Sequence, residues 1–129
     1  MRAAWESGVI LAGVSAGSLC WHVGGATDSF GPELRPVTNG LGLLPYANGV
    51  HYDSEAQRRP LLHQLLLDGA LPPLAYATDD HVGVWYEGVD ATTVVGDYTP
   101  APGGPAAYRV ERLDDDVLET RVEVGDNFA

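Results

Sequence analysis

Basic residues are scarce in this 129-residue chain, which has 7 lysines and arginines against 18 aspartates and glutamates. The formal net charge of −11 repels nucleic-acid phosphates and anionic membrane surfaces, so neither is expected as a partner. Long apolar runs are also absent, because no segment reaches the roughly 18 consecutive apolar residues that a membrane span needs. The N-terminus lacks the apolar stretch of a signal peptide.

The chain has one cysteine, Cys20, so no internal disulfide can form. A single thiol suits a reducing compartment, and we expect a cytoplasmic protein. The spacing of cysteine and histidine predicts no structural zinc site. The aspartates at 114–116 lack the alternating ligands and the glycine of an EF-hand loop, which favours a solvated turn. The length and a hydrophobic content of 45% indicate one globular domain.

The stretch from residue 8 to residue 18 carries the most specific pattern in the sequence. Val9–Ala12 form a short apolar run bounded by glycines, which predicts a strand buried on both faces of a parallel sheet. Gly13–Gly17 then match G-x-S-x-G, the pattern of a tight strand-to-helix turn that presents a serine at the sheet's carboxyl edge. Ser15 is therefore the candidate nucleophile. The alternative is an incidental serine in a glycine-rich turn.

The rest of the chain predicts short elements separated by turns. Residues 26–46 contain three prolines and three glycines, which predicts turns and short extended pieces. Ser54–Gln57 form a capping box, so a helix is predicted after Ser54, with its regular part from near Pro60 and its end near Gly69. The other predicted elements are a helix at 16–23 ended by Gly24-Gly25, a buried strand at 74–77, a hairpin of 82–86 with 91–95, a Pro/Gly loop at 98–105 and a C-terminal hairpin at 106–125.

A serine hydroxyl needs a base to take its proton, and the chain offers four histidines. His63 falls in the leucine-rich helix, where a packing role explains it. His22 closely follows the elbow, and His81 opens a strand beside two aspartates. His51 ends a short extended segment just before a helix, a placement at the carboxyl edge of an α/β sheet. On spacing alone, His51 has a modest lead.

The chain resembles the peptidase E family of serine peptidases (S51), which also contains cyanophycinases. The resemblance runs from about residue 8 to residue 95. It rests on Gly13–Gly17, Thr27-Asp28, Gly49–Asp53 and Ala77–Asp80, which occur in the family's order.

This resemblance implies a flavodoxin-like α/β fold related to class I glutamine amidotransferases, with a parallel sheet and a nucleophile elbow, followed here by β-hairpins. It implies a serine peptidase for small peptides, in one branch dipeptides with an N-terminal aspartate, that needs no metal or other cofactor. The implied roles are nucleophile for Ser15, general base for His51 and oxyanion donor for the N–H of Ala16.

The third member of the implied triad has several candidates. The family places an acidic residue after the strand that follows the histidine-bearing helix, which favours Asp79, with Asp80 adjacent. Asp28, shortly after the elbow, is the other candidate and otherwise helps to shape the site. Arginines are the candidates for binding a substrate carboxylate, with pairing to the chain's own acids as the alternative. These arginines are Arg58, Arg59 and Arg35.

Members of the family carry several strands before the elbow, including a glycine-rich loop that supplies a second oxyanion donor. Here the elbow begins at Gly13, so we expect residues 1–129 to form a single domain without that N-terminal half. The apolar edge of a strand at 8–13 would then need covering, which predicts a homo-oligomer. The alternative function is a non-catalytic oligomerisation or binding module that retains the elbow.

Overall fold

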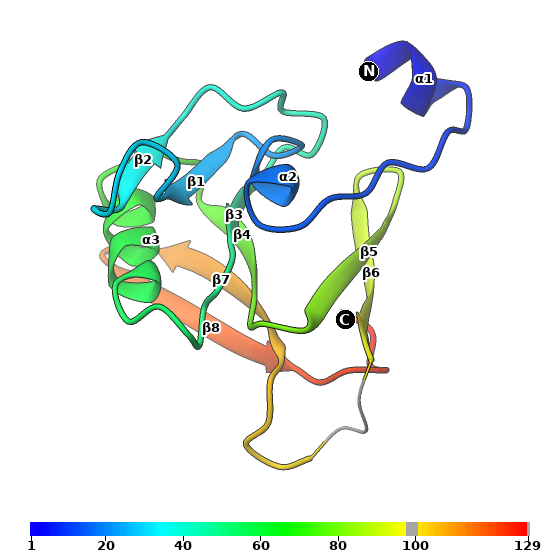
Figure 1. Cartoon of the computed structure of the whole chain (residues 1–129). Coiled ribbons are helices and arrows are strands. Elements are labelled where there is room, and N and C mark those ends of the chain that lie inside the picture. The colour runs from blue at the N-terminus through cyan, green and yellow to red at the C-terminus, as the bar shows by residue number, and fades with distance from the viewer. Residues whose placement is uncertain (98–100, 129) are drawn as a thin grey trace.

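The computed structural model, which describes residues 1–97 and 101–128, is an α/β structure with a mixed sheet of six strands. The strand order is β2-β1-β3-β4-β7-β8, and β5 and β6 form a separate two-stranded sheet (Figure 1). The elements in chain order are α1 (Arg2–Glu6), α2 (Ala16–Leu19), β1 (Gly24–Thr27), β2 (Arg35–Val37), β3 (Ala47–Gly49), α3 (Arg58–Leu67), β4 (Leu74–Thr78), β5 (Val82–Glu87), β6 (Asp90–Gly96), β7 (Ala107–Leu113) and β8 (Asp116–Val122).

The centre of the large sheet is parallel and its flanks are antiparallel. β3 pairs in parallel with β1 on one side and with β4 on the other. β2 joins β1, β7 joins β4 and β8 joins β7, all in antiparallel register. The expected α/β class is therefore confirmed, but the sheet is mixed rather than purely parallel.

Helix α3 supplies most of the apolar surface that covers the sheet. Leu62 and Leu66 are almost fully buried and belong to one core cluster with Ala75 and Val110 of β4 and β7. Pro60 occupies the first turn of α3, where its missing N–H costs nothing. Gly69, with φ +78°, follows the helix at the C′ position, as the sequence predicts.

The glycines at 24 and 25 begin the buried strand β1, so the prediction that they end a helix over 16–23 is wrong. A Cβ on Gly24 would lie 1.8 Å from the carbonyl oxygen of Val37, and a Cβ on Gly25 would lie 2.2 Å from that of Asn48. These residues are glycines because the backbones on either side approach too closely for a side chain. The helix before them ends at Leu19 rather than Val23.

The predicted strand over Val9–Ala12 is not formed. This segment runs as irregular chain between α1 and α2 (Figure 1), and Ile10 is 76% exposed. Among the described residues, the peptide groups of residues 10–13 make no backbone hydrogen bonds. An apolar run forms a strand only where a neighbouring strand supplies hydrogen-bond partners, and no described strand pairs with this segment.

Both hairpins of the second half are present as antiparallel pairs. β5 pairs with β6, and β7 pairs with β8 through a turn at the exposed Asp114 and Asp115. Of the predicted Pro/Gly loop, residues 98–100 lie outside the described residues and the others carry no strand. In the described part of the chain, no helix has the length and hydropathy that a membrane crossing requires.

Candidate active site

Ser15 lies at the start of α2 in a strained backbone conformation, with φ +54° and ψ −120°. An L-residue in such a sparsely populated region costs on the order of 1–3 kcal/mol, and such strain concentrates at functional sites. Gly13 makes this turn possible, because a Cβ there would lie 2.0 Å from the carbonyl oxygen of Gly17. A Cβ on Gly17 would meet nothing within 4 Å. The two glycines of the G-x-S-x-G pattern are therefore not equivalent.

His51 brings its imidazole to Ser15 from the carboxyl end of β3. The Nε2 atom lies 2.9 Å from the Ser15 Oγ, although the two residues are 36 positions apart. His51 also has a positive φ, of +50°. The end of a parallel strand and the start of α2 thus place the two side chains in direct contact.

The acid that completes this contact is Asp80. Its Oδ1 lies 2.6 Å from the Nδ1 of His51. Because an ionised carboxylate only accepts hydrogen bonds, Nδ1 carries the proton and Nε2 is left to accept the hydroxyl proton of Ser15. Hydrogen bonds from His51 and then Ser54 hold the pKa of Asp80 below its ordinary value. The backbone N–H of Asp80 donates to the Asp53 carboxylate at 2.9 Å, which fixes the turn after β4.

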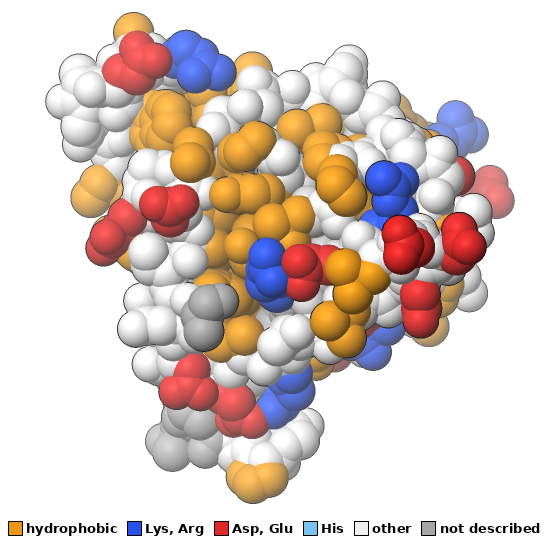
Figure 2. All heavy atoms as spheres, turned by 180° about the vertical axis from the view of Figure 1, so that it is seen from behind, with side chains coloured by type: hydrophobic (Ala, Val, Ile, Leu, Met, Phe, Trp, Pro, Cys, Tyr) orange, Lys and Arg blue, Asp and Glu red, His pale blue; other side chains and the backbone are white. Residues whose placement is uncertain are grey.

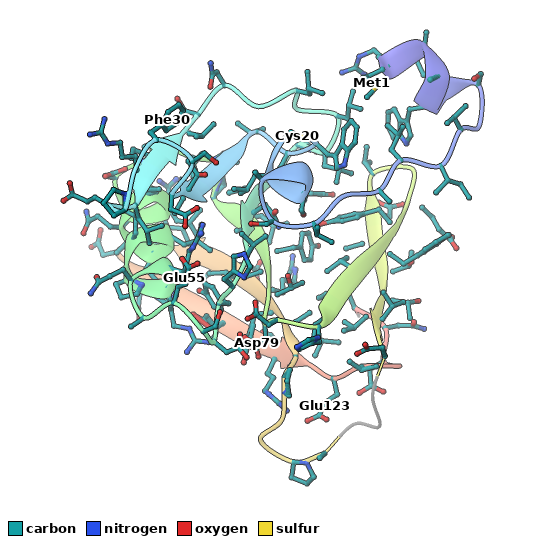
Figure 3. The ribbon with its side chains drawn as sticks, in the orientation of Figure 1. Met1, Cys20, Phe30, Glu55, Asp79 and Glu123 are labelled. Atoms are coloured by element: carbon teal, nitrogen blue, oxygen red, sulfur yellow. The ribbon has the colours of Figure 1, made fainter. Side chains whose placement is uncertain are left out.

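Asp79 is not bonded to His51, which differs from the expected arrangement. It lies at the end of β4, where the chain turns toward β5 (Figure 3). Its Oδ2 accepts hydrogen bonds from the Ala106 N–H at 2.9 Å and the Tyr108 hydroxyl at 3.1 Å. Burial raises the pKa of this carboxyl, whose Oδ1 has no partner among the described residues. Asp79 ties β4 to β7, and the structure pairs His51 with Asp80 instead.

Asp28 and Arg58, two further candidates from the sequence, pair with each other. Asp28 lies 3.6 Å from the guanidinium of Arg58 and is about half exposed. Arg58 is 2% exposed, binds Glu55 at 2.7 Å and donates to the carbonyl of Ala26. These contacts join the start of α3 to the end of β1. The Arg58 guanidinium is therefore buried and bonded to groups of the protein itself.

The remaining candidate arginines also lie apart from Ser15. Arg59 stacks on the rings of Tyr52 and Tyr108, at 4.5 and 5.1 Å, and pairs with Glu119 at 3.2 Å. Arg35 belongs to β2 at the far edge of the large sheet.

The other histidines have separate partners or positions. His22 donates from Nδ1 to the carbonyl of Ser18 at 2.8 Å and accepts the hydroxyl of Tyr86 at Nε2, 3.0 Å away. Burial lowers the pKa of His22 to about 4, so this ring is neutral near pH 7. His63 pairs with Glu119 through its Nε2.

Two supporting contacts escaped the sequence analysis. The buried Asn48 accepts the Ser18 hydroxyl at 2.9 Å and donates to the carbonyl of Tyr76 at 2.9 Å, which fastens α2 to the sheet. Asp53 holds the Asp80 turn, as described above. Asp53 ends the Gly49–Asp53 segment on which the resemblance rests, and Asn48 directly precedes it, but the sequence assigned neither residue a role.

A cavity of about 850 Å³ opens beside Ser15 and His51. Its walls come from the segment before Ser15, from the end of β4 and from the β5–β6 hairpin. The N–H of Ala16 makes no hydrogen bond with any described residue, and Ala16 is an exposed residue beside Ser15. No group of three or more His, Cys, Asp or Glu side chains among the described residues could hold a metal ion.

Comparison with known proteins agrees with the resemblance. The family model "Peptidase family S51" matches residues 1–94. The chain is 36% identical over 124 residues to the protein named "Uncharacterized peptidase YgaJ" of Bacillus subtilis (strain 168). That alignment covers 96% of this chain and 51% of the relative, so the chain spans about half of the relative's length. No solved structure gave a significant match. The chain belongs to peptidase family S51.

Proposed function

We propose that this domain is a serine peptidase that hydrolyses small peptides through Ser15, His51 and Asp80. The observation that carries the proposal is the continuous hydrogen-bonded series from the Ser15 hydroxyl through His51 to the Asp80 carboxylate, with distances of 2.9 and 2.6 Å. Family membership and a relative named as a peptidase support the same chemistry. We also infer that the mixed sheet is part of a flavodoxin-like domain.

In the proposed mechanism, Ser15 Oγ attacks the scissile carbonyl while His51 Nε2 takes its proton. His51 then gives that proton to the leaving amine, and the acyl-serine is hydrolysed by water in a second, equivalent step. Asp80 keeps the Nδ1 proton in place and stabilises the imidazolium that forms. The strained φ and ψ of Ser15 support this role, since they are typical of a serine held at a nucleophile turn.

The N–H of Ala16 is our candidate for binding the oxyanion that develops during attack. Removing one donor from an oxyanion hole lowers turnover by about 10²–10³ in serine peptidases. With the Ala16 N–H as a single oxyanion donor, the proposal predicts slow turnover, and a second donor would raise it. A covalent probe therefore tests the nucleophile better than a turnover assay.

The alternative is a binding module in which the serine and the histidine stay in contact without turnover. The exposed apolar residues before Ser15 favour this alternative, because they are typical of a surface that another polypeptide covers. The two proposals differ in the reactivity of Ser15.

The experiment is labelling of the 129-residue chain with a small alkyl fluorophosphonate, with mass spectrometry to locate the modified residue. We expect modification at Ser15 in the wild type and loss of labelling in His51→Ala. The matched control His63→Ala, which removes a histidine bonded to Glu119, is expected to label like the wild type. Labelling that survives in His51→Ala would remove His51 as the base. A wild type with no labelled Ser15 would favour the binding module.

A further inference from the structure

Among the described residues that line the cavity beside Ser15, none is an arginine or a lysine. The carboxylates among these described residues are Asp79 and Asp80, and the rest of the described wall is histidine, small polar, aromatic or apolar. The chain has no lysine at all, so its seven basic residues are all arginines. None of these arginines lines the cavity.

The arginines are also engaged elsewhere. Five of them pair with carboxylates of the chain, and these are Arg2, Arg58, Arg59, Arg109 and Arg121. Arg112 donates to the carbonyl of Leu66 behind α3, and Arg35 lies on the outermost strand of the sheet. A substrate carboxylate in the cavity would therefore find no guanidinium, and it would face Asp80 and the net charge of −11.

The walls of the cavity favour apolar groups instead. The β5–β6 hairpin contributes Val84, Trp85 and Val95, and the opposite side contributes Leu44 and Val50 from the loops that flank β3. Leu44 and Val50 are buried, so they form a fixed apolar floor rather than a mobile rim. His22, which also lines the cavity, is held neutral by its burial, which outweighs the opposite effect of its hydrogen bond to the carbonyl of Ser18.

We propose that the peptides taken by this site carry apolar or aromatic side chains rather than acidic ones. This inference rests on the proposed function, because it places the substrate in the cavity beside Ser15. It departs from the N-terminal aspartate dipeptides that the peptidase E resemblance implies. The departure has a physical cause: an arginine is the strongest partner for a carboxylate in a partly buried site, and no arginine among the described residues lines this cavity, although Arg59 and Arg121 line a neighbouring one that also contains Asp79.

The test is protection of Ser15 against the alkyl fluorophosphonate by dipeptides, measured at pH 8 so that histidines of ordinary pKa are neutral. We expect Phe-Leu to slow labelling of Ser15 at a concentration at least about tenfold lower than Asp-Leu, since one apolar group in a fitted pocket discriminates by roughly 10–200-fold. Equal or stronger protection by Asp-Leu would overturn the inference while leaving the nucleophile established. If the probe did not label Ser15 at all, the proposed function itself would fail.

Two variants of the β5–β6 hairpin sharpen the test. Val95 lines the cavity and is 44% exposed, whereas Val89 lies at the hairpin turn outside it and is 40% exposed. Val95→Arg places a cation in the cavity, and we expect it to shift the preference toward Asp-Leu. Val89→Arg adds the same charge and should retain the wild-type order of protection. An unchanged preference in a folded Val95→Arg, or an equal shift in both variants, would contradict the cavity as the binding site.

Discussion

At the scale of single residues, the turn that holds Ser15 depends on Gly13 and not on Gly17. A side chain at Gly13 would collide with backbone that cannot move independently of α2, whereas Gly17 has open space around it. The sequence pattern treats the two glycines alike, and only the packing distinguishes them.

This difference predicts opposite results for two matched substitutions. Gly13→Ala should shift the Ser15 backbone and reduce fluorophosphonate labelling at least about tenfold, because a 1 Å misplacement can cost about 10² in rate. Gly17→Ala should label within about twofold of the wild type, since the new methyl group meets no atom. Circular dichroism would check that both variants are folded. Equal labelling of the two variants would contradict this account of the turn.

The acid beside His51 also shows what spacing can and cannot predict. Asp79 and Asp80 are neighbours at the end of a strand, where successive side chains point to opposite sides. One therefore turns toward β7 and the other toward His51, and the sequence alone does not reveal which. The contact between Ser15 and His51 was expected from the family resemblance, which assigns both residues to one site, although the strand expected before Ser15 is not formed.

At the scale of elements, the sequence predicted α3, β4 and both hairpins from hydrophobic pattern and turn residues. The sequence-based predictions failed where the pairing between strands decides whether a strand forms. Val9–Ala12 are apolar enough for a buried strand, but no described strand pairs with them. β1 was missed because its glycines serve close backbone packing, a requirement that is set by residues far along the chain.

The contact between the α2 region and β5 gives a pH prediction. His22 is buried against Tyr86 with its pKa lowered from 6.5 to about 4. The unfolded chain therefore binds a proton at His22 between pH 6.5 and 4 while the folded chain does not. Above pH 6.5 the ring is neutral in both states and its titration does not affect stability. As the pH falls from 6.5 to 4, the free energy of unfolding decreases by up to about 3 kcal/mol.

Urea denaturation at pH 7 and at pH 4.5 checks this prediction. The wild type should lose more free energy of unfolding between the two values than His22→Asn, which has no group that titrates in this range. An identical pH dependence in the two proteins would show that His22 is not protected from protonation in the folded state.

At the scale of the whole molecule, apolar side chains remain uncovered. Figure 2 shows hydrophobic side chains gathered across the middle of one face. Val9, Ile10 and Val14 are 51%, 76% and 87% exposed in the segment that leads to Ser15. We predict that a second copy of the chain covers this segment, since twofold dimers are the commonest assemblies.

Light scattering over a range of concentrations tests the predicted self-association. The wild type should be larger than a 13.7 kDa monomer, and Ile10→Asp should shift it toward the monomer. The matched control is Phe30→Asp, because Phe30 is 68% exposed in a different loop, and this variant should associate like the wild type. A wild type that stays monomeric at every concentration would contradict the prediction.

The measurement that tests the central claim most directly is the rate of Ser15 labelling in Asp80→Asn and in Asp79→Asn. Asparagine keeps the shape of aspartate but cannot stabilise the imidazolium, a change that costs about 10⁴ in turnover in a serine peptidase triad. The account predicts a large loss of labelling for Asp80→Asn and a much smaller loss for Asp79→Asn, which changes only the link to Ala106 and Tyr108. An equal loss, or the larger loss in a folded Asp79→Asn, would contradict the assignment of Asp80 to the triad.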